Sequence, residues 1–149
     1  MINTATLETL LSLHNENQQK SEKILADIVQ KKNCAETKLS ELLLSREHFQ
    51  KNFEEQSKQG INSFSYNQYM LFIQNLDKII NDQYKIITQI GHENSVAKAK
   101  WIESKKQVLI YNNIKTKQNV VQNNIVLKKE QNQQDEWCLR QYYEKNKDK

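Results

Sequence analysis

The histidine and cysteine side chains are the first candidates for metal chemistry in this chain. A zinc site on a helix needs ligands about four residues apart, so that they share one face. His14, His48 and His92 show this spacing neither with one another nor with Cys34 or Cys138. The sequence therefore predicts no metal site, and two distant thiols fit a reducing compartment.

The carboxylates and glycines are equally unsuited to catalysis. Neighbouring acidic residues occur at 54–55 and 135–136. Adjacent positions on a helix point in different directions, so these carboxylates should be solvated and not paired as acid and base. A phosphate-binding loop needs two glycines five residues apart, and the glycines here are Gly60 and Gly91. We expect no catalytic residue, no cofactor and no enzymatic activity.

The segment 95–129 is strongly basic, with eight lysines and Glu103 as the one acidic residue. One interpretation is a solvated helix face. The other is a basic collar that attracts an acidic protein surface or nucleic acid. Nucleic-acid binding is disfavoured, because arginines and interleaved aromatic residues are missing. The collar would consist of Lys105, Lys106, Lys115 and Lys117.

Proline is absent from all 149 residues, and the chain has only two glycines. Proline breaks helices, and average usage would give about seven in a chain of this length. An apolar content of 37% is too low for a deep core. It is sufficient for a narrow seam in which only two positions of each heptad are apolar. These features predict an all-α protein of very long helices.

Heptad spacing predicts one helix over about 5–57 and a second over about 66–145. Nine of the fifteen seam positions in the first helix are apolar. The fifteen positions, polar ones included, are Leu7, Leu11, His14, Gln18, Ser21, Leu25, Ile28, Lys32, Ala35, Leu39, Leu42, Arg46, Phe49, Phe53 and Gln56. The second stripe is Tyr66, Tyr69, Ile73, Leu76, Ile80, Gln83, Ile87, Ile90, Asn94, Ala97, Trp101, Ser104, Val108 and Tyr111.

A turn over about 58–65 separates the two predicted helices. Gly60 can adopt the left-handed conformation that ends a helix. Asn62, Ser63 and Ser65 are typical turn and N-cap residues. Ser65 and Gln68 have capping-box spacing, so the second helix should start near Tyr66. The short turn predicts an antiparallel two-helix coiled-coil hairpin, a single domain over 1–149. Paired residue numbers should add to about 123, which leaves the helix after about 118 projecting and unpaired.

Apolar residues crowd the predicted turn, and the segment 69–73 is apolar on more than one face. Half of this surface can be explained as a clamp that closes the hairpin. The remainder should be exposed and is typical of a partner-binding site. No stretch approaches the roughly 18 apolar residues that span a bilayer. No N-terminal stretch resembles a signal peptide, so we expect a soluble intracellular protein.

Four segments together resemble the flagellar FliJ family of type III export proteins over nearly the whole chain. They are Leu7-Glu8-Thr9-Leu10, then Gly60-Ile61 with Tyr69-x-x-Phe72-Ile73-Gln74-x-Leu76-x-Lys78, then Trp101 with Lys105-Lys106, and finally Asp135-Glu136-Trp137. The injectisome stalk proteins share this architecture and are the nearest alternative. The resemblance implies an antiparallel helical hairpin that is a non-enzymatic stalk of the export apparatus.

The resemblance also implies three partners: the hexameric flagellar export ATPase, the export gate protein FlhA, and the export chaperones that the protein escorts. One end would enter the ATPase ring and stimulate hydrolysis. We expect the free end to contact the ATPase, with the residues Leu7, Leu10, Leu11, Val121, Ile125, Asp135, Glu136 and Trp137.

The gate-facing surface of the family matches residues on both helices near the turn. They are Lys38, Leu42, Ser45, Phe49, Phe72, Leu76, Ile79 and Gln83. Leu42, Phe72 and Leu76 keep the family's apolar pattern, whereas four of the others depart from it. The implied location is cytoplasmic, peripheral at the cytoplasmic face of the inner membrane. The competing classes are a structural coiled-coil scaffold and a nucleic-acid-binding coiled coil.

Overall fold

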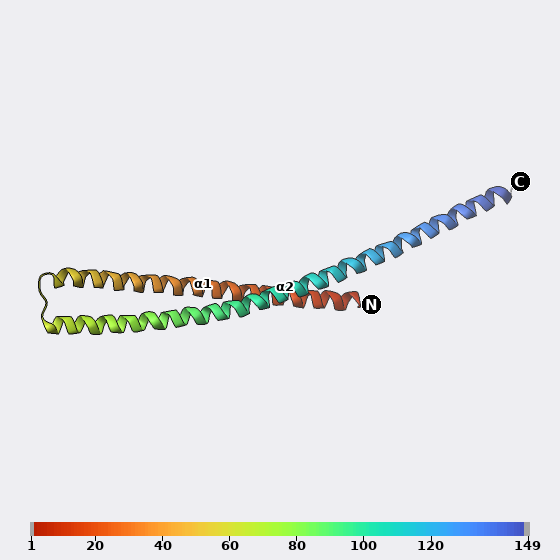
Figure 1. The fold of residues 1–149 in the computed structure, drawn as a ribbon. Helices are drawn as coiled ribbons and strands as arrows, with labels where there is room; N and C mark the ends of the chain where they lie inside the picture. The colour runs from red at the N-terminus through yellow and green to blue at the C-terminus, as the bar shows by residue number, and fades with distance from the viewer. Residues whose placement is uncertain (1, 148–149) are drawn as a thin grey trace. The chain divides into compact units, whose positions relative to one another are not determined.

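A computed structural model describes residues 2–147 of the chain (Figure 1). It contains two helices, α1 (Thr4–Ser57) and α2 (Ser63–Lys147), and no strand within the described residues. The helices form an antiparallel hairpin, so the all-α fold class predicted from the sequence is confirmed. Neither helix has, in its described part, a stretch both long and apolar enough to cross a bilayer.

The structure divides into two units. We call Asn17–Ser104, which includes the turn, the turn unit. We call Met1–Glu16 together with Lys105–Lys149 the terminal unit. Each unit combines a part of α1 with a part of α2. The predicted single domain over 1–149 stays a prediction.

The core of the turn unit is a thin seam between the two helices. Its buried apolar side chains are Ala35, Leu76, Ile80, Ile90 and Ala97. Every seam position that the heptads predict in this unit is buried or half-buried, except three beside the turn: Phe49, Gln56 and Tyr66. The heptad pattern therefore identified the packed face of both helices.

In the terminal unit, the start of α1 packs on α2. Leu7 is only 1% exposed, and Val108 is buried on the opposite helix. Gln118 is the last half-buried residue of α2, and its Nε2 donates a hydrogen bond to the carbonyl oxygen of Ile2 at 3.1 Å. Every residue from 119 to 147 is exposed. The end of pairing at about 118 agrees with the sequence prediction.

The turn is shorter than predicted, because α2 begins at Ser63 and not near Tyr66. Asn62 caps the helix: its Oδ1 accepts a hydrogen bond from the backbone N–H of Ser65 at 2.8 Å. Of the three N-cap candidates, Asn62 is the one that caps α2, and the predicted capping box at Ser65 is wrong. Asparagine caps a helix as well as serine does, and it precedes Ser65 in the chain. Gly60 has a φ of 91°, as the left-handed end of α1 requires.

Contacts across the turn unit fix the pairing of the two helices. The Nζ of Lys31 lies 3.7 Å from a carboxylate oxygen of Glu93. The Nε of Arg46 lies 2.6 Å from Oδ1 of Asp77. The paired residue numbers add to 124 and 123, which agrees with the predicted value of about 123. In the terminal unit, His14 and Tyr111 stack with ring centroids 4.6 Å apart and add to 125.

Candidate protein-binding surfaces

An aromatic cluster closes the turn unit beside the turn. Phe53 and Tyr69 stack with their ring centroids 3.7 Å apart and their planes at 5°. Phe49 and Phe72 meet edge to face at 4.7 Å. Both pairs join α1 to α2, so part of this apolar surface is the predicted clamp.

Several side chains in and near this cluster are also partly open to solvent. Phe49 is 45% exposed, Phe72 is 43% exposed, and Ile79 on α2 is 49% exposed. Lys38 and Ser45 are exposed on α1, and Leu42 is half-buried between them. These six members of the predicted gate-binding set therefore have surface that a partner can reach. We call them the gate face: Lys38, Leu42, Ser45, Phe49, Phe72 and Ile79.

Leu76 and Gln83, the other two members of that set, lie inside the helix pair. Gln83 is only 4% exposed, and its Nε2 donates a hydrogen bond to the carbonyl oxygen of Ala35 at 3.0 Å. Both residues also belong to the predicted seam. A partner cannot contact them directly unless the helices separate. Any role they have in binding is to position the exposed side chains above them.

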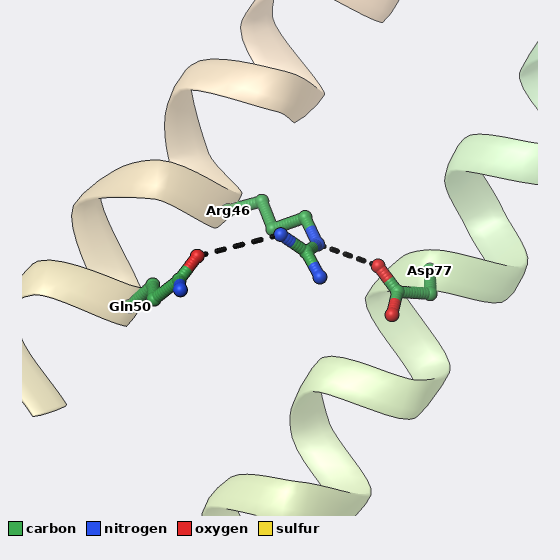
Figure 2. A network of polar contacts seen from close by, with 3 residues as sticks. All are labelled: Arg46, Gln50 and Asp77. Carbon is green, nitrogen blue, oxygen red and sulfur yellow. Dashed lines mark hydrogen bonds and ion pairs between the residues drawn. The ribbon is translucent and has the colours of Figure 1, made fainter.

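An ion pair between the helices lies close to the gate face (Figure 2). The Nε of Arg46 donates a hydrogen bond to Asp77, and its Nη1 donates one to Oε1 of Gln50 at 3.4 Å. The hydrogen bond to Asp77 and the charge of that carboxylate raise the pKa of Arg46 above its ordinary value. The heptads place Arg46 in the seam, and the predicted pairing places it opposite position 77, where Asp77 is its partner.

A recess lies beside the turn, next to the gate face. Its wall combines the rings of Phe49 and Tyr69 with the side-chain amides of Asn52, Gln56 and Asn62. Amides can both donate and accept hydrogen bonds, and the aromatic rings offer apolar surface. This combination suits contacts with a protein better than the binding of a charged small molecule.

The predicted ATPase-binding residues fall into three classes of exposure in the terminal unit. Leu7 is buried, and Leu10 and Leu11 are half-buried against α2. The remaining five residues lie on α2 beyond the paired part, and all are exposed: Val121, Ile125, Asp135, Glu136 and Trp137. Trp137 is 63% exposed. The structure thus separates a packed N-terminal turn from an open stretch of helix.

The four lysines of the predicted collar also lie on α2 in the terminal unit. Lys105, Lys106 and Lys117 are exposed, and Lys115 is half-buried. Successive residues of an α-helix are rotated by about 100°, so these positions point in several directions around the axis. The lysines therefore surround the helix and do not form a single stripe.

The remaining candidates for metal chemistry lie apart in the structure. Within residues 2–147, no group of three or more His, Cys, Asp or Glu side chains is placed to hold a metal ion. Cys34 and Cys138 are exposed free thiols. His14 stacks on Tyr111 within the packed part of the terminal unit.

The fold and its surfaces define a class of protein: an antiparallel helical hairpin whose exposed apolar residues suit contacts with other proteins. The family model described as "Flagellar FliJ protein" matches residues 3–147. The chain therefore belongs to the FliJ family, and the resemblance seen in the sequence is confirmed. It is a flagellar export-related protein from a family of non-enzymatic export components. No curated protein and no solved structure matches the chain.

Proposed function

We propose that this protein is the stalk and escort component of the flagellar type III export apparatus. Its terminal unit inserts into the hexameric export ATPase and stimulates hydrolysis. Its turn unit binds the export gate protein FlhA, and the protein cycles export chaperones. The family match favours this function over the injectisome alternative, since the family is flagellar.

The observation that carries the proposal is the open part of α2, residues 119–147. All of its described side chains are exposed, and they include large apolar ones such as Ile125, Trp137 and Leu139. A helix without tertiary packing is marginally stable in water, because packing of an apolar face supplies most helical stability in proteins. A binding partner that covers this segment would supply that packing, and the ATPase ring is the partner we assign.

The basic collar supports the same assignment through its charge. Lysines on several sides of a helix create a positive potential around it, which attracts an acidic opening from any approach direction. Lys105, Lys106, Lys115 and Lys117 precede the open segment along α2. We propose that they meet acidic residues at the mouth of the ATPase ring.

The gate face supports the contact with FlhA. Phe49 and Phe72 contact each other across the helices and still leave nearly half of each side chain exposed. Aromatic residues held rigidly at a surface are typical anchors of protein interfaces. Leu76 and Gln83 act as supports below this face. Binding to the gate would place the protein peripherally at the cytoplasmic face of the inner membrane.

The experiment for the ATPase role is hydrolysis by the cognate export ATPase with and without this protein. We expect the full chain to raise turnover and the number of rings seen by electron microscopy. A chain truncated after Gln118 should lose both effects and keep its paired helices. Phe72→Ala, in the turn unit, is the control that should still stimulate. If the truncated chain stimulates as well as the full one, the open segment is not the ATPase-binding part.

A further inference from the structure

The open segment of α2 has an uneven distribution of charge. From 119 to 129 it carries Lys128 and Lys129 and no acidic residue. From 130 to 147 it carries four carboxylates against Arg140, Lys145 and Lys147. The acidic residues are Glu130, Asp135, Glu136 and Glu144. A pair of lysines at 128–129 is therefore followed by a pair of carboxylates at 135–136.

The heptad frame of α2 continues into this segment without a partner. The frame that buries Val108 and half-buries Gln118 leads on to exposed positions. They are Gln122, Ile125, Lys129, Asn132, Glu136, Leu139, Tyr143 and Asn146. Its apolar members, Ile125, Leu139 and Tyr143, lie on either side of a polar middle made of Lys129, Asn132 and Glu136. It is a coiled-coil seam that no described part of α1 covers.

The charge layout decides which way round a second helix of the same sequence would pack. A parallel copy would place Lys128 and Lys129 against the same lysines of its partner, which repel. An antiparallel copy centred at Asn132 places Lys129 opposite a second Asp135, and Lys128 opposite a second Glu136. It also brings Ile125 toward a second Leu139. The segment is thus complementary to itself in the antiparallel orientation.

We propose that residues 119–147 pair with the same segment of a second copy, as an antiparallel two-fold symmetric dimer. The exposed seam supplies the apolar contacts, and the charged residues set the orientation. At the centre, the two Asn132 side chains can satisfy each other's donor and acceptor groups. The polar middle of the seam makes the dimer weak and reversible, because polar residues at seam positions lower coiled-coil stability.

This inference goes beyond the proposed function and depends on no other protein. If the open segment is also the part that enters the ATPase, the dimer covers the same surface. The dimer would then be the form in which the segment is protected before the ATPase is available. ATPase binding and self-pairing would exclude each other.

Sedimentation velocity of the full chain tests the dimer. We expect a shift from monomer to dimer as the concentration rises from about 1 to 200 µM, the range for a weak complex. Raising the salt to about 0.5 M should weaken the dimer several-fold, because the Debye length then falls well below 10 Å. A chain that stays monomeric over this range at low salt would overturn the proposal.

Charge reversal tests the orientation. We expect the variant Lys128→Glu with Lys129→Glu to remain monomeric, because acidic residues would then face Asp135 and Glu136 of the partner. The variant Asp135→Lys with Glu136→Lys should be monomeric for the corresponding reason. Mixed together, the two variants should form a heterodimer, since every facing pair is then opposite in charge.

The control is Lys98→Glu with Lys100→Glu, which makes the same change of net charge as the lysine variant, at exposed positions of the turn unit. It should dimerise as the parent does. Circular dichroism at about 1 µM, where every form is expected to be monomeric, should show equal helicity in all variants, because the altered side chains are exposed. Dimers that persist in both reversed variants, or a mixture that stays monomeric, would overturn the antiparallel pairing. Either result leaves the ATPase measurement unaffected.

Discussion

The side-chain amide of Gln83 on α2 donates a hydrogen bond to the backbone carbonyl of Ala35 on α1, at 3.0 Å. Gln83 is the one buried polar residue among the described part of the chain, and Ala35 is small enough to let it approach. The hydrogen bond therefore fixes where α2 lies along α1 in the turn unit. It also explains how a polar residue can occupy a seam position.

Replacing Gln83 should separate its packing role from its polar role. We expect Gln83→Ala to lower the free energy of unfolding by about 1–2 kcal/mol, since it removes a buried hydrogen bond and leaves a small cavity. Gln83→Leu should be close to neutral, because it keeps the volume and removes the polar group. Denaturant unfolding followed by circular dichroism measures both. Gln74→Ala, at an exposed position, is the control and should change little.

The helix cap gives a second prediction. Asn62→Ala should lower the free energy of unfolding by about 1 kcal/mol, because the backbone N–H of Ser65 loses its acceptor. Ser65→Ala should change stability by less than about 0.5 kcal/mol, as expected of an exposed residue inside a helix. The same unfolding experiment compares the two. Equal losses, or a larger loss for Ser65→Ala, would contradict the position of the cap.

The gate face gives a third prediction. Phe72→Ala should weaken binding to FlhA about tenfold, since it removes an exposed anchor and the edge-to-face contact with Phe49. Calorimetry with the cytoplasmic part of FlhA measures the affinity, and circular dichroism checks that helicity is retained. Leu71→Ala removes a neighbouring exposed side chain outside the gate face and should bind normally. Gln83→Leu should also bind nearly normally if that residue only supports the surface.

The collar gives a fourth prediction. Changing Lys105, Lys106, Lys115 and Lys117 to Glu should weaken binding to the export ATPase by tenfold or more, because attraction becomes repulsion. High salt should weaken ATPase binding by the parent protein and have little effect on ATPase binding by the variant. The matched control reverses four exposed lysines of the turn unit, Lys23, Lys58, Lys78 and Lys85. If neither high salt nor the four collar substitutions alter the affinity for the export ATPase, an electrostatic contact is ruled out.

The sequence predicted the seam well, because a two-helix fold has one packed face per helix and heptad spacing identifies it directly. The positions that deviate lie beside the turn, where Phe49 and Tyr66 have few neighbours to cover them. The start of α2 was predicted three residues late. Asn62 and Ser65 are both good caps, and only the folded turn decides between them.

The surfaces were harder to predict than the fold. Gln83 belonged both to the seam and to the gate-binding set, and the sequence alone does not show that packing excludes it from the surface. Asp77 lies next to a seam position, and its pairing with Arg46 depends on the exact register of the two helices. Heptads specify which face packs; they do not specify the side-chain contacts at its edge.

The central claim is that the open segment of α2 lies inside the ATPase ring. The most direct test places a photo-reactive amino acid at position 121 or 137 of the full chain and irradiates it with the assembled ATPase. We predict crosslinks to the ATPase from both positions and none from position 71, an exposed control in the turn unit. Crosslinks from 71 without any from 121 or 137 would contradict the assignment.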